Sequence, residues 1–302
     1  MIQIQQLTKS YDGQDVVNIE NLQIQKGSIF ALLGPNAAGK TTTIKTLATI
    51  VAPDLAQVRV AGYDLLTQKK EIQKSIGYVA QSFGLYGELS VIQNIRFYAS
   101  LYGVNDEKHF EDLMKKYHIF HFKDAQADTL SGGYKRRLAL VCALAHNPDV
   151  IFLDEPTAGI DPLSRKNLWD IFYELSTQGK TLFVTTHYME EASRSHKIAF
   201  LNEGQIIAYG SPKEVQESLK EYDVYIYEGI FEYTMLQALQ AIKEIYLINQ
   251  FGNELRMLIK KDSDPQKIQT SMQTYIEGPV LLKKGSANLE DVFIALTQKV
   301  SL

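Results

Sequence analysis

The segment from residue 34 to residue 41 reads Gly34-Pro35-Asn36-Ala37-Ala38-Gly39-Lys40-Thr41, which matches the pattern G-x-x-x-x-G-K-[ST]. It follows an apolar run at 29–33 and opens a helical pattern at 41–50. Glycines let the backbone curl so that its N–H groups face a phosphate, and a helix start adds free N–H donors and the positive end of a dipole. Lys40 can then reach the β- and γ-phosphates, and the hydroxyl of Thr41 can bind Mg²⁺. The segment predicts a nucleotide site, but it does not say which class of enzyme uses it.

Short apolar runs alternate with helical patterns over the first two thirds of the chain. The runs are rich in β-branched or aromatic residues and lie at 29–33, 75–79, 150–153 and 181–184, with helical patterns such as 41–50 and 162–176 between them. Nearly all-apolar runs are typical of strands buried on both faces of a mainly parallel sheet, and strands that alternate with helices predict the α/β class. Residues 2–7 and 16–24 predict the strands of an antiparallel flank.

The pattern changes near residue 210, at Gly210-Ser211-Pro212. The following patterns predict a small α+β domain with helices at 212–220, 234–245 and 265–275, a half-buried strand at 222–227, and a hairpin over 246–259 that turns at Gly252-Asn253. We therefore expect a first domain over 1–215, with a helical subdomain at about 82–146, and a C-terminal accessory domain over 216–302.

Composition limits the class of protein. The 302 residues are 45% hydrophobic and 22% charged, which argues against a disordered or disulfide-stapled chain. The formal net charge is −4, so no basic surplus predicts nucleic acid as a partner. We find no apolar run near the roughly 18 residues that span a bilayer and no signal-peptide pattern at the start. The single cysteine, Cys142, is expected in the core. Alone, these counts predict a soluble, cytosolic, reduced protein.

Polar side chains follow three predicted strands at the point where each strand ends. Asp154 and Glu155 come directly after 150–153, Gln81 follows 75–79, and His187 follows the run that begins at Thr181. Because ligands of open α/β sheets bind at the carboxyl ends of strands, these side chains are expected at the phosphate loop. Asp154 would hold Mg²⁺ through water, Glu155 would polarise the attacking water, Gln81 would contact the metal or that water, and His187 would hydrogen-bond a γ-phosphate. Gln81 or His187 alone would more often be structural or merely exposed.

A second anion-ready helix start lies at Ser131-Gly132-Gly133, followed by Tyr134 and three cations, and its helix runs to about residue 145. Positive charge in a first helical turn opposes the helix dipole by roughly 0.3–1 kcal/mol per charge, and an anion there would reverse that penalty. The alternative is a solvated basic turn. A second phosphate contact can face a nucleotide on another copy, which predicts a closed two-fold dimer with two nucleotides between the chains.

The motifs occur in a fixed order along the chain: GPNAAGKTT (34–42), Gln81, LSGGY (130–134), VIFLDEP (150–156), AGID (158–161) and TTH (185–187). Together they resemble the ATP-binding cassette (ABC) family. The resemblance implies a P-loop NTPase sheet with an antiparallel flank and a helical subdomain, with ATP and Mg²⁺ bound. Tyr11 looks like the aromatic that stacks on adenine, and the loop through Lys40, Thr41 and Thr42 like the phosphate and magnesium residues.

The same resemblance implies roles for the remaining motifs. Ser131, Gly132 and Gly133 look like the signature that caps the ATP of the partner subunit. Asp154 and Glu155 look like the metal-linked acid and the catalytic base, and Asp161 like the D-loop residue at the dimer interface. Gln81 looks like the residue that couples the site to a membrane partner, and His187 like the switch histidine.

Two positions depart from the family pattern. The family usually has glycine where Ala37 lies, and an alanine there is expected to keep a negative φ. It usually has glutamine where Tyr134 lies, which leaves the strength of the contact to the partner's ATP open. Lys40, Glu155 and His187 are all present, so a hydrolysing site is still expected.

A narrower resemblance adds the direction of transport. Residues 81–103, residues 186–212 and the ending NLEDVFIALT (288–297) are similar to the branch that exports drugs, polysaccharides and lipids, the ABC-2-type exporters. Asn288 and Asp291 also form a start like a capping box for the last helix. The resemblance implies that Phe83, Leu85, Tyr86 and Leu89 form an apolar cleft for a membrane subunit; ordinary core packing is the alternative.

The main hypothesis is an ATPase subunit of an exporter, held at the cytoplasmic face of the inner or plasma membrane by a separate integral-membrane permease. Two cassettes, identical or different, would close on ATP, and no nucleic acid is expected as a partner. One alternative is a non-transport ABC ATPase that acts on DNA or ribosomes, but the chain has neither a coiled-coil insertion nor a second cassette. Another is a regulatory cassette that only binds ATP, against which Glu155 and His187 argue.

Overall fold

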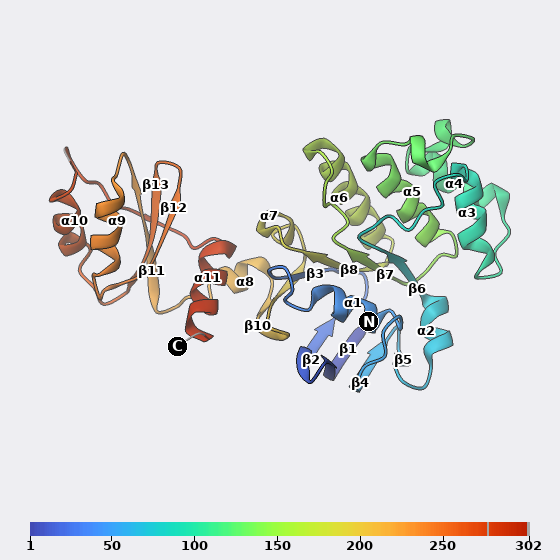
Figure 1. The fold of residues 1–302 in the computed structure, drawn as a ribbon, viewed down its shortest axis with the longest axis horizontal. Helices are drawn as coiled ribbons and strands as arrows, with labels where there is room; N and C mark the ends of the chain where they lie inside the picture. The colour runs from blue at the N-terminus through green and yellow to red at the C-terminus, as the bar shows by residue number, and fades with distance from the viewer. Residues whose placement is uncertain (277, 301–302) are drawn as a thin grey trace. The chain divides into compact units, whose positions relative to one another are not determined.

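A computed structural model describes residues 1–276 and 278–300, which fall into two compact units, Met1–Tyr209 and Gly210–Leu302 (Figure 1). Within the described residues, no helix is both long and apolar enough to cross a membrane.

The first unit is built on a six-stranded sheet with the order β10-β9-β3-β8-β7-β6. Its strands are β3 (Ile29–Leu33), β6 (Ile76–Val79), β7 (Val150–Asp154), β8 (Thr181–Thr186), β9 (Lys197–Asn202) and β10 (Gln205–Gly210). The pairs β9/β3, β3/β8, β8/β7 and β7/β6 are parallel, and every residue of β3, β7 and β8 is buried. The predicted α/β class is therefore confirmed, and the four strands β3, β8, β7 and β6 end at the same edge of the sheet.

An antiparallel sheet flanks this core, as the two N-terminal patterns predicted. It contains, in the order β2-β1-β4-β5, the strands β2 (Gln14–Ile24), β1 (Ile2–Tyr11), β4 (Leu55–Val60) and β5 (Tyr63–Asp64). Helix α1 (Lys40–Leu47) packs in the same apolar cluster through Ile44 and Leu47, and α2 (Lys69–Ser75) follows β5.

The remaining helices of the first unit cover the other side of the six-stranded sheet (Figure 1). They are α3 (Val91–Ser100), α4 (Glu107–Lys116), α5 (Gly132–Leu144), α6 (Pro162–Thr177) and the short α7 (Met189–Ala192), with 3-10 turns at Phe120–Phe122 and Ala127–Thr129. Cys142 on α5 is buried in the core that α3, α4, α5 and α6 share, where burial raises the pKa of its thiol. This confirms the expectation of a core cysteine.

The second unit has the topology β-α-β-β-α-β. Its elements are β11 (Tyr222–Glu228), α9 (Tyr233–Gln240), β12 (Ile245–Phe251), β13 (Glu254–Lys260), α10 (Pro265–Gln273) and β14 (Lys283–Gly285), with the sheet order β12-β13-β11-β14. This is the split βαβ arrangement of ferredoxin-like folds. Helices α9 and α10 pack on one face of the sheet through Leu239 and Met272. Helix α11 (Leu289–Val300) packs on the other face through Ala295, and α8 (Pro212–Gln216) begins the unit.

Candidate nucleotide-binding site

The loop after β3 is shaped by glycines whose side-chain space is already filled. A Cβ on Gly34 would lie 2.2 Å from the carbonyl oxygen of Leu201, and one on Gly39 would lie 2.3 Å from that of Val16. Gly39 also has a φ of +101°, which L-residues rarely adopt. The expectation that Ala37 keeps a negative φ is wrong, because its φ is +64°. Alanine is therefore held in the left-handed region, at a cost of roughly 1–2 kcal/mol.

The Lys40 side chain is buried and points back over its own loop. Its Nζ donates hydrogen bonds to the carbonyl oxygens of Gly34 and Pro35, both at 2.8 Å, and lies 3.7 Å from Oε1 of Glu155. Burial lowers the pKa of the Lys40 ammonium, while the carboxylates of Glu155 and Asp154 act against that shift. The loop carbonyls thus hold the ammonium group where an anion in the loop would meet it.

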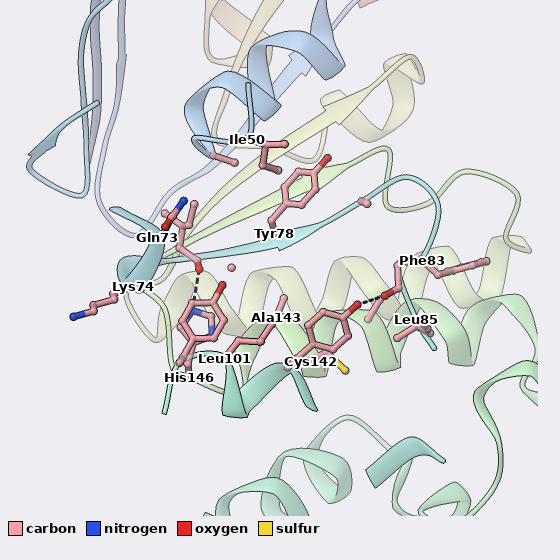
Figure 2. A pocket seen from close by; sticks show the side chains of 18 of the residues that line it. Ile50, Gln73, Lys74, Tyr78, Phe83, Leu85, Leu101, Cys142, Ala143 and His146 are labelled. Atoms are coloured by element: carbon pink, nitrogen blue, oxygen red, sulfur yellow. Dashed lines mark hydrogen bonds between the residues drawn. The ribbon is translucent and has the colours of Figure 1, made fainter. Parts of the chain in front are cut away.

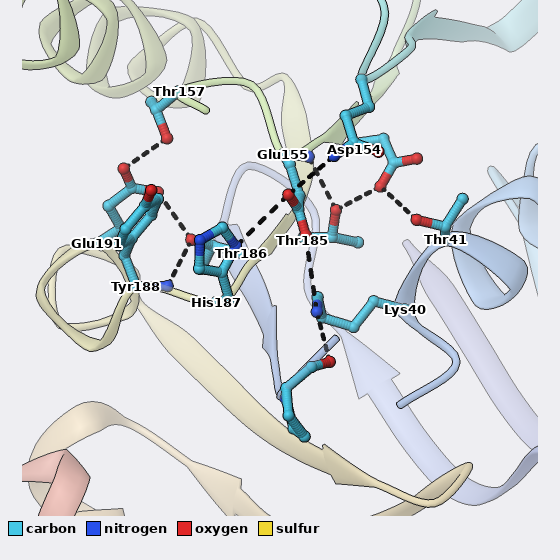
Figure 3. Close-up of polar contacts among 12 residues, drawn as sticks. Lys40, Thr41, Asp154, Glu155, Thr157, Thr185, Thr186, His187, Tyr188 and Glu191 are labelled. Carbon is cyan, nitrogen blue, oxygen red and sulfur yellow. Dashed lines mark hydrogen bonds and ion pairs between the residues drawn. The ribbon is translucent and has the colours of Figure 1, made fainter. Parts of the chain in front are cut away.

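Asp154, at the end of β7, is buried and accepts hydrogen bonds from two hydroxyl groups. Its Oδ1 accepts from Oγ1 of Thr41 at 3.2 Å and from Oγ1 of Thr185 at 2.7 Å (Figure 3). The neighbouring strands β7 and β8 pair Asp154 with Thr185 directly, so the parallel register brings these groups together. Thr185 is a site residue that the sequence reasoning did not single out.

Glu155 lies between the two other strand-end residues. Its Oε2 accepts from Nε2 of Gln81 at 3.1 Å. The same oxygen lies 3.4 Å from Nδ1 of His187 (Figure 3). Its φ is +45°, an uncommon conformation for glutamate, and its backbone N–H donates to Oγ1 of Thr185 at 2.9 Å. The structure therefore brings Gln81, Glu155 and His187 together beside Lys40, at the edge of the sheet where the loop lies.

The oxygen donors at this edge suit Mg²⁺. The hydroxyl of Thr41 and the carboxylate of Asp154 are hard ligands on adjoining elements, and Mg²⁺ is usually held by one or two carboxylates together with water and substrate phosphates. In the part of the chain that the structure describes, no group of three or more His, Cys, Asp or Glu side chains could hold a metal alone. Water and phosphate oxygens would complete the coordination of a Mg²⁺ ion held by Thr41 and Asp154. Gln81 bonds to Glu155 rather than to this pair, and its metal contact stays a prediction.

A cavity of about 420 Å³ opens beside the loop. Its lining includes Asn36, Lys40 and Thr42 from the loop segment together with Gln81 and Glu155. Tyr11, expected to stack on adenine, is half-exposed at the end of β1, with the ammonium of Lys9 5.1 Å from its ring centre. Tyr11 does not line the cavity, and its stacking role stays a prediction.

The second helix start lies outside this cavity. Ser131 is the N-cap of α5, but its side chain makes no capping hydrogen bond. A Cβ on Gly133 would lie 2.7 Å from Oγ of Ser164, so this glycine allows α5 to approach α6. Asp161 caps α6 by accepting from the backbone N–H of Ser164 at 2.9 Å. Ser131, Gly132, Gly133 and Asp161 are all absent from the cavity lining, so any contact of theirs with a nucleotide stays a prediction.

The three cations of this helix are not equivalent. Arg136 is buried and donates to the carbonyl oxygens of Ala80 at 3.0 Å and Glu155 at 3.4 Å. Arg136 therefore supports the backbone beside Gln81 and at Glu155. Neither the predicted anion contact nor the alternative of a solvated basic turn included this role. Lys135 lies 3.7 Å from the carboxylate of Asp128. Tyr134 packs its ring on Phe122, with centroids 4.7 Å apart, which explains how the subdomain accommodates it.

A larger apolar cleft of about 630 Å³ lies between the sheet and the helices (Figure 2). Phe83, Leu85, Leu101 and Tyr102 are among its lining residues. The expected docking residues Tyr86 and Leu89 do not line this cleft, because both lie further along the connection to α3. Tyr86 packs its ring against Phe97 instead, with centroids 4.6 Å apart.

The parallel sheet and its loop after β3 define a P-loop nucleotide-binding protein. Residues 17–158 match the ABC transporter family model. Nod factor export ATP-binding protein I of Burkholderia thailandensis is 34% identical over 305 residues, which cover 98% of this chain and 96% of that protein. The chain therefore belongs to the ABC transporter family.

Two further comparisons give the extent of the likeness. YbhF of Escherichia coli K12, a probable multidrug ABC transporter ATP-binding protein, is 38% identical over 219 residues, which cover 72% of this chain but 38% of YbhF. The chain therefore matches well under half of YbhF. The dimeric ATP-binding cassette MJ0796, solved in a post-hydrolysis state with ADP and Pi, has a TM-score of 0.64 at 25% identity and covers 70% of this chain and 98% of its own.

Proposed function

We propose that this chain is the ATP-hydrolysing subunit of an ABC exporter. The observation that carries the proposal is the convergence of Lys40, Asp154, Glu155 and His187 at one sheet edge, beside the phosphate loop. The relatives named above are export or multidrug ATP-binding proteins, which supports transport over a role on DNA or ribosomes.

The residues divide the chemistry between them. The Lys40 ammonium, held by two loop carbonyls, offsets phosphate charge, and the loop N–H groups orient the chain of phosphates. Glu155 orients the attacking water, and His187 supports the γ-phosphate from the other side of that carboxylate. Thr41 and Asp154 would hold Mg²⁺, which when bound neutralises charge on the phosphate oxygens.

Two copies complete the site. In this arrangement Ser131, Gly132 and Gly133 of one chain close over the ATP that the loop of the other chain holds, and Asp161 lies at the interface. The dimeric cassette MJ0796 supports a dimer of this kind. Both a homodimer and a pair with a related chain satisfy this geometry.

A separate integral-membrane permease supplies the path for the cargo. Its cytoplasmic segment binds the cleft between sheet and helices, which begins beside Gln81 at Phe83 and Leu85. This contact places the chain at the cytoplasmic face of the membrane and lets cassette closure act on the permease.

The decisive experiment replaces Glu155 with glutamine. Glu155→Gln keeps the size of the side chain but removes the charge that orients water, so ATP turnover should be abolished while ATP binding persists and an ATP-bound dimer accumulates. Phosphate release and light scattering after gel filtration measure the two effects. Hydrolysis at the wild-type rate would show that Glu155 is not the base.

A further inference from the structure

One buried carboxylate near the site has no part in the steps above. Glu191, on the short helix α7, is fully buried. Its Oε1 accepts a hydrogen bond from Oγ1 of Thr157 and lies 3.3 Å from Nε of Arg165. Its Oε2 accepts from Oγ1 of Thr186 at 2.8 Å (Figure 3). Because burying a charge is costly, two hydroxyl donors and a guanidinium group beside one carboxylate indicate a connection that the fold maintains.

The three partners belong to the segments that carry the site. Thr157 lies two residues after Glu155, and Thr186 directly precedes His187. Arg165 lies on α6, the helix that Asp161 caps. Glu191 therefore joins, through side chains alone, the loop after β7, the end of β8 and the start of α6.

This connection bears on the distance between Glu155 and His187. The two residues leave different strands, and Oε2 of one lies 3.4 Å from Nδ1 of the other. Oγ1 of Thr186, while donating to Glu191, accepts from the backbone N–H of Tyr188 at 3.0 Å, which fixes the turn that holds His187. The Tyr188 ring in turn packs on the guanidinium of Arg165, 4.8 Å from the ring centre.

We propose that Glu191 is a positioning residue, which sets the separation and orientation of Glu155 and His187 and links both to α6. The inference rests on the proposed ATPase function. Glu191 does not line the cavity beside the phosphate loop, so its effect falls on turnover and not on nucleotide binding. Small displacements of reacting groups are costly, up to about 100-fold for roughly 1 Å.

The test compares Glu191→Gln with Glu190→Gln in the full-length chain. Glu190 is the adjacent residue, but its side chain is 73% exposed and pairs with Arg194 at the surface. Glu191→Gln should lower kcat by about 10- to 100-fold and leave the affinity for trinitrophenyl-ATP unchanged, whereas Glu190→Gln should change neither. A kcat per folded molecule equal to wild type, with only a lower melting temperature, would mean a purely structural role and would overturn the proposal.

A second set of variants protects the test against misfolding. Thr157→Val and Thr186→Val each remove one donor while keeping the β-branched shape, and each should lower kcat without changing trinitrophenyl-ATP affinity. In a double-mutant cycle, the combined loss from Thr157→Val and Glu191→Gln should be smaller than the sum of the two single losses, because the two residues share one hydrogen bond. Additive losses would contradict the proposed link.

Glu155→Gln, assayed beside these variants, separates the two proposals. If Glu155→Gln abolishes turnover while Glu191→Gln keeps it, only the positioning role fails. If the wild-type chain binds trinitrophenyl-ATP but releases no phosphate above the Glu155→Gln level, the hydrolytic function fails, and the role of Glu191 fails with it.

Discussion

Thr185 joins the two acids of the site through one hydroxyl group, which donates to Asp154 at 2.7 Å and accepts from the N–H of Glu155 at 2.9 Å. Thr185→Val keeps the shape but leaves a buried carboxylate oxygen with one donor fewer, which should lower the free energy of unfolding by about 1–3 kcal/mol. It should also lower kcat by about tenfold, because both acids lose a positioning contact.

Thr181 provides the control for this variant. It lies at the opposite end of β8, is equally buried, and accepts a hydrogen bond from the N–H of Gly27 at 3.0 Å. Thr181→Val should cost similar stability in urea unfolding but leave kcat unchanged. Equal kcat values for the two variants would show that the Thr185 hydroxyl serves stability alone.

We expect His146 to make the stability of the fold depend on pH. Its ring stacks on Tyr102 at 3.6 Å, and Nε2 lies 2.8 Å from the carbonyl oxygen of Ile76. Burial lowers the pKa of His146, and nearby Lys180 acts in the same direction. The unfolded chain therefore takes up this proton first as pH falls below about 6.5, so the free energy of unfolding should decrease from there down to the folded pKa.

The effect is measured by urea unfolding at pH 7.5 and 5.5. His146→Gln should reduce the loss of stability between these values, while His118→Asn, at an exposed position with a φ of +57°, should not change it. If His146→Gln has the same pH dependence as wild type, the decrease in the free energy of unfolding comes from other titrating groups.

At the scale of elements, apolar runs predicted the buried strands well but placed some boundaries wrongly. Ser75 was expected in a strand, yet it ends α2, where its hydroxyl donates to the carbonyl oxygen of Glu71. The helix expected over 234–245 ends at Gln240. The prediction was too long because Ile242 and Ile245 continue the apolar spacing of the helix through a turn into β12. Periodicity records which residues are buried, and a turn can bury the same residues as a helix.

At the site, too, sequence patterns predicted some residues, whereas others depend on tertiary contacts. Lys40, Glu155 and His187 were predictable because each follows a strand whose end is fixed by the parallel sheet. Arg136 and Glu191 were not, because their partners are set by how loops and helices pack. Both also stand beside other charged residues in the sequence, Arg136 between Lys135 and Arg137 and Glu191 after Glu190, so charge did not mark them out. The turn that holds Arg136 was interpreted as an anion contact, with a solvated basic turn as the alternative.

The start of α11 combines a predictable feature with an unpredictable one. Asn288 and Asp291 exchange the expected hydrogen bonds, at 2.7 and 3.0 Å. Asp291 also binds the buried guanidinium of Arg256 on β13, with Nη2 to Oδ2 at 2.7 Å. Sequence patterns did not reveal this second contact, which joins residues 35 positions apart.

Breaking this pair should loosen the helix. Asp291→Asn leaves the buried Arg256 with only the partly exposed Glu254, 3.2 Å away, as its counter-charge, which should cost up to about 3–5 kcal/mol and expose the second unit to limited proteolysis. Glu228→Gln, which breaks the exposed pair with Lys283, should have little effect. Equal protease resistance of the two variants would show that the pair of Arg256 and Asp291 does not stabilise this unit.

At the scale of the whole molecule, one chain offers only half of the expected nucleotide contacts. Ser131 and Gly132 are exposed at the start of α5, and neither lines the cavity beside the phosphate loop. If they contact ATP across a two-fold axis, Glu155→Gln should double its mass on adding ATP. Ser131→Arg in the same chain should prevent that doubling, because the larger side chain clashes with the partner's nucleotide, yet it should keep trinitrophenyl-ATP binding.

A mixture of chains makes the prediction specific for contact between copies. In the Glu155→Gln background, a Lys40→Ala chain and a Ser131→Arg chain each lack one half of the contacts. A dimer of the two chains has one complete site, in which the Ser131→Arg chain supplies Lys40 and the Lys40→Ala chain supplies Ser131. Its second site combines the two substituted residues and is defective. Light scattering should then show dimers that depend on ATP, whereas each chain alone should show no dimers. The nucleotide bound to the mixed dimers should amount to about one ATP per dimer. If Ser131→Arg dimerises like its parent, α5 does not face the nucleotide. If the parent itself stays monomeric in ATP, the second cassette must be a different chain.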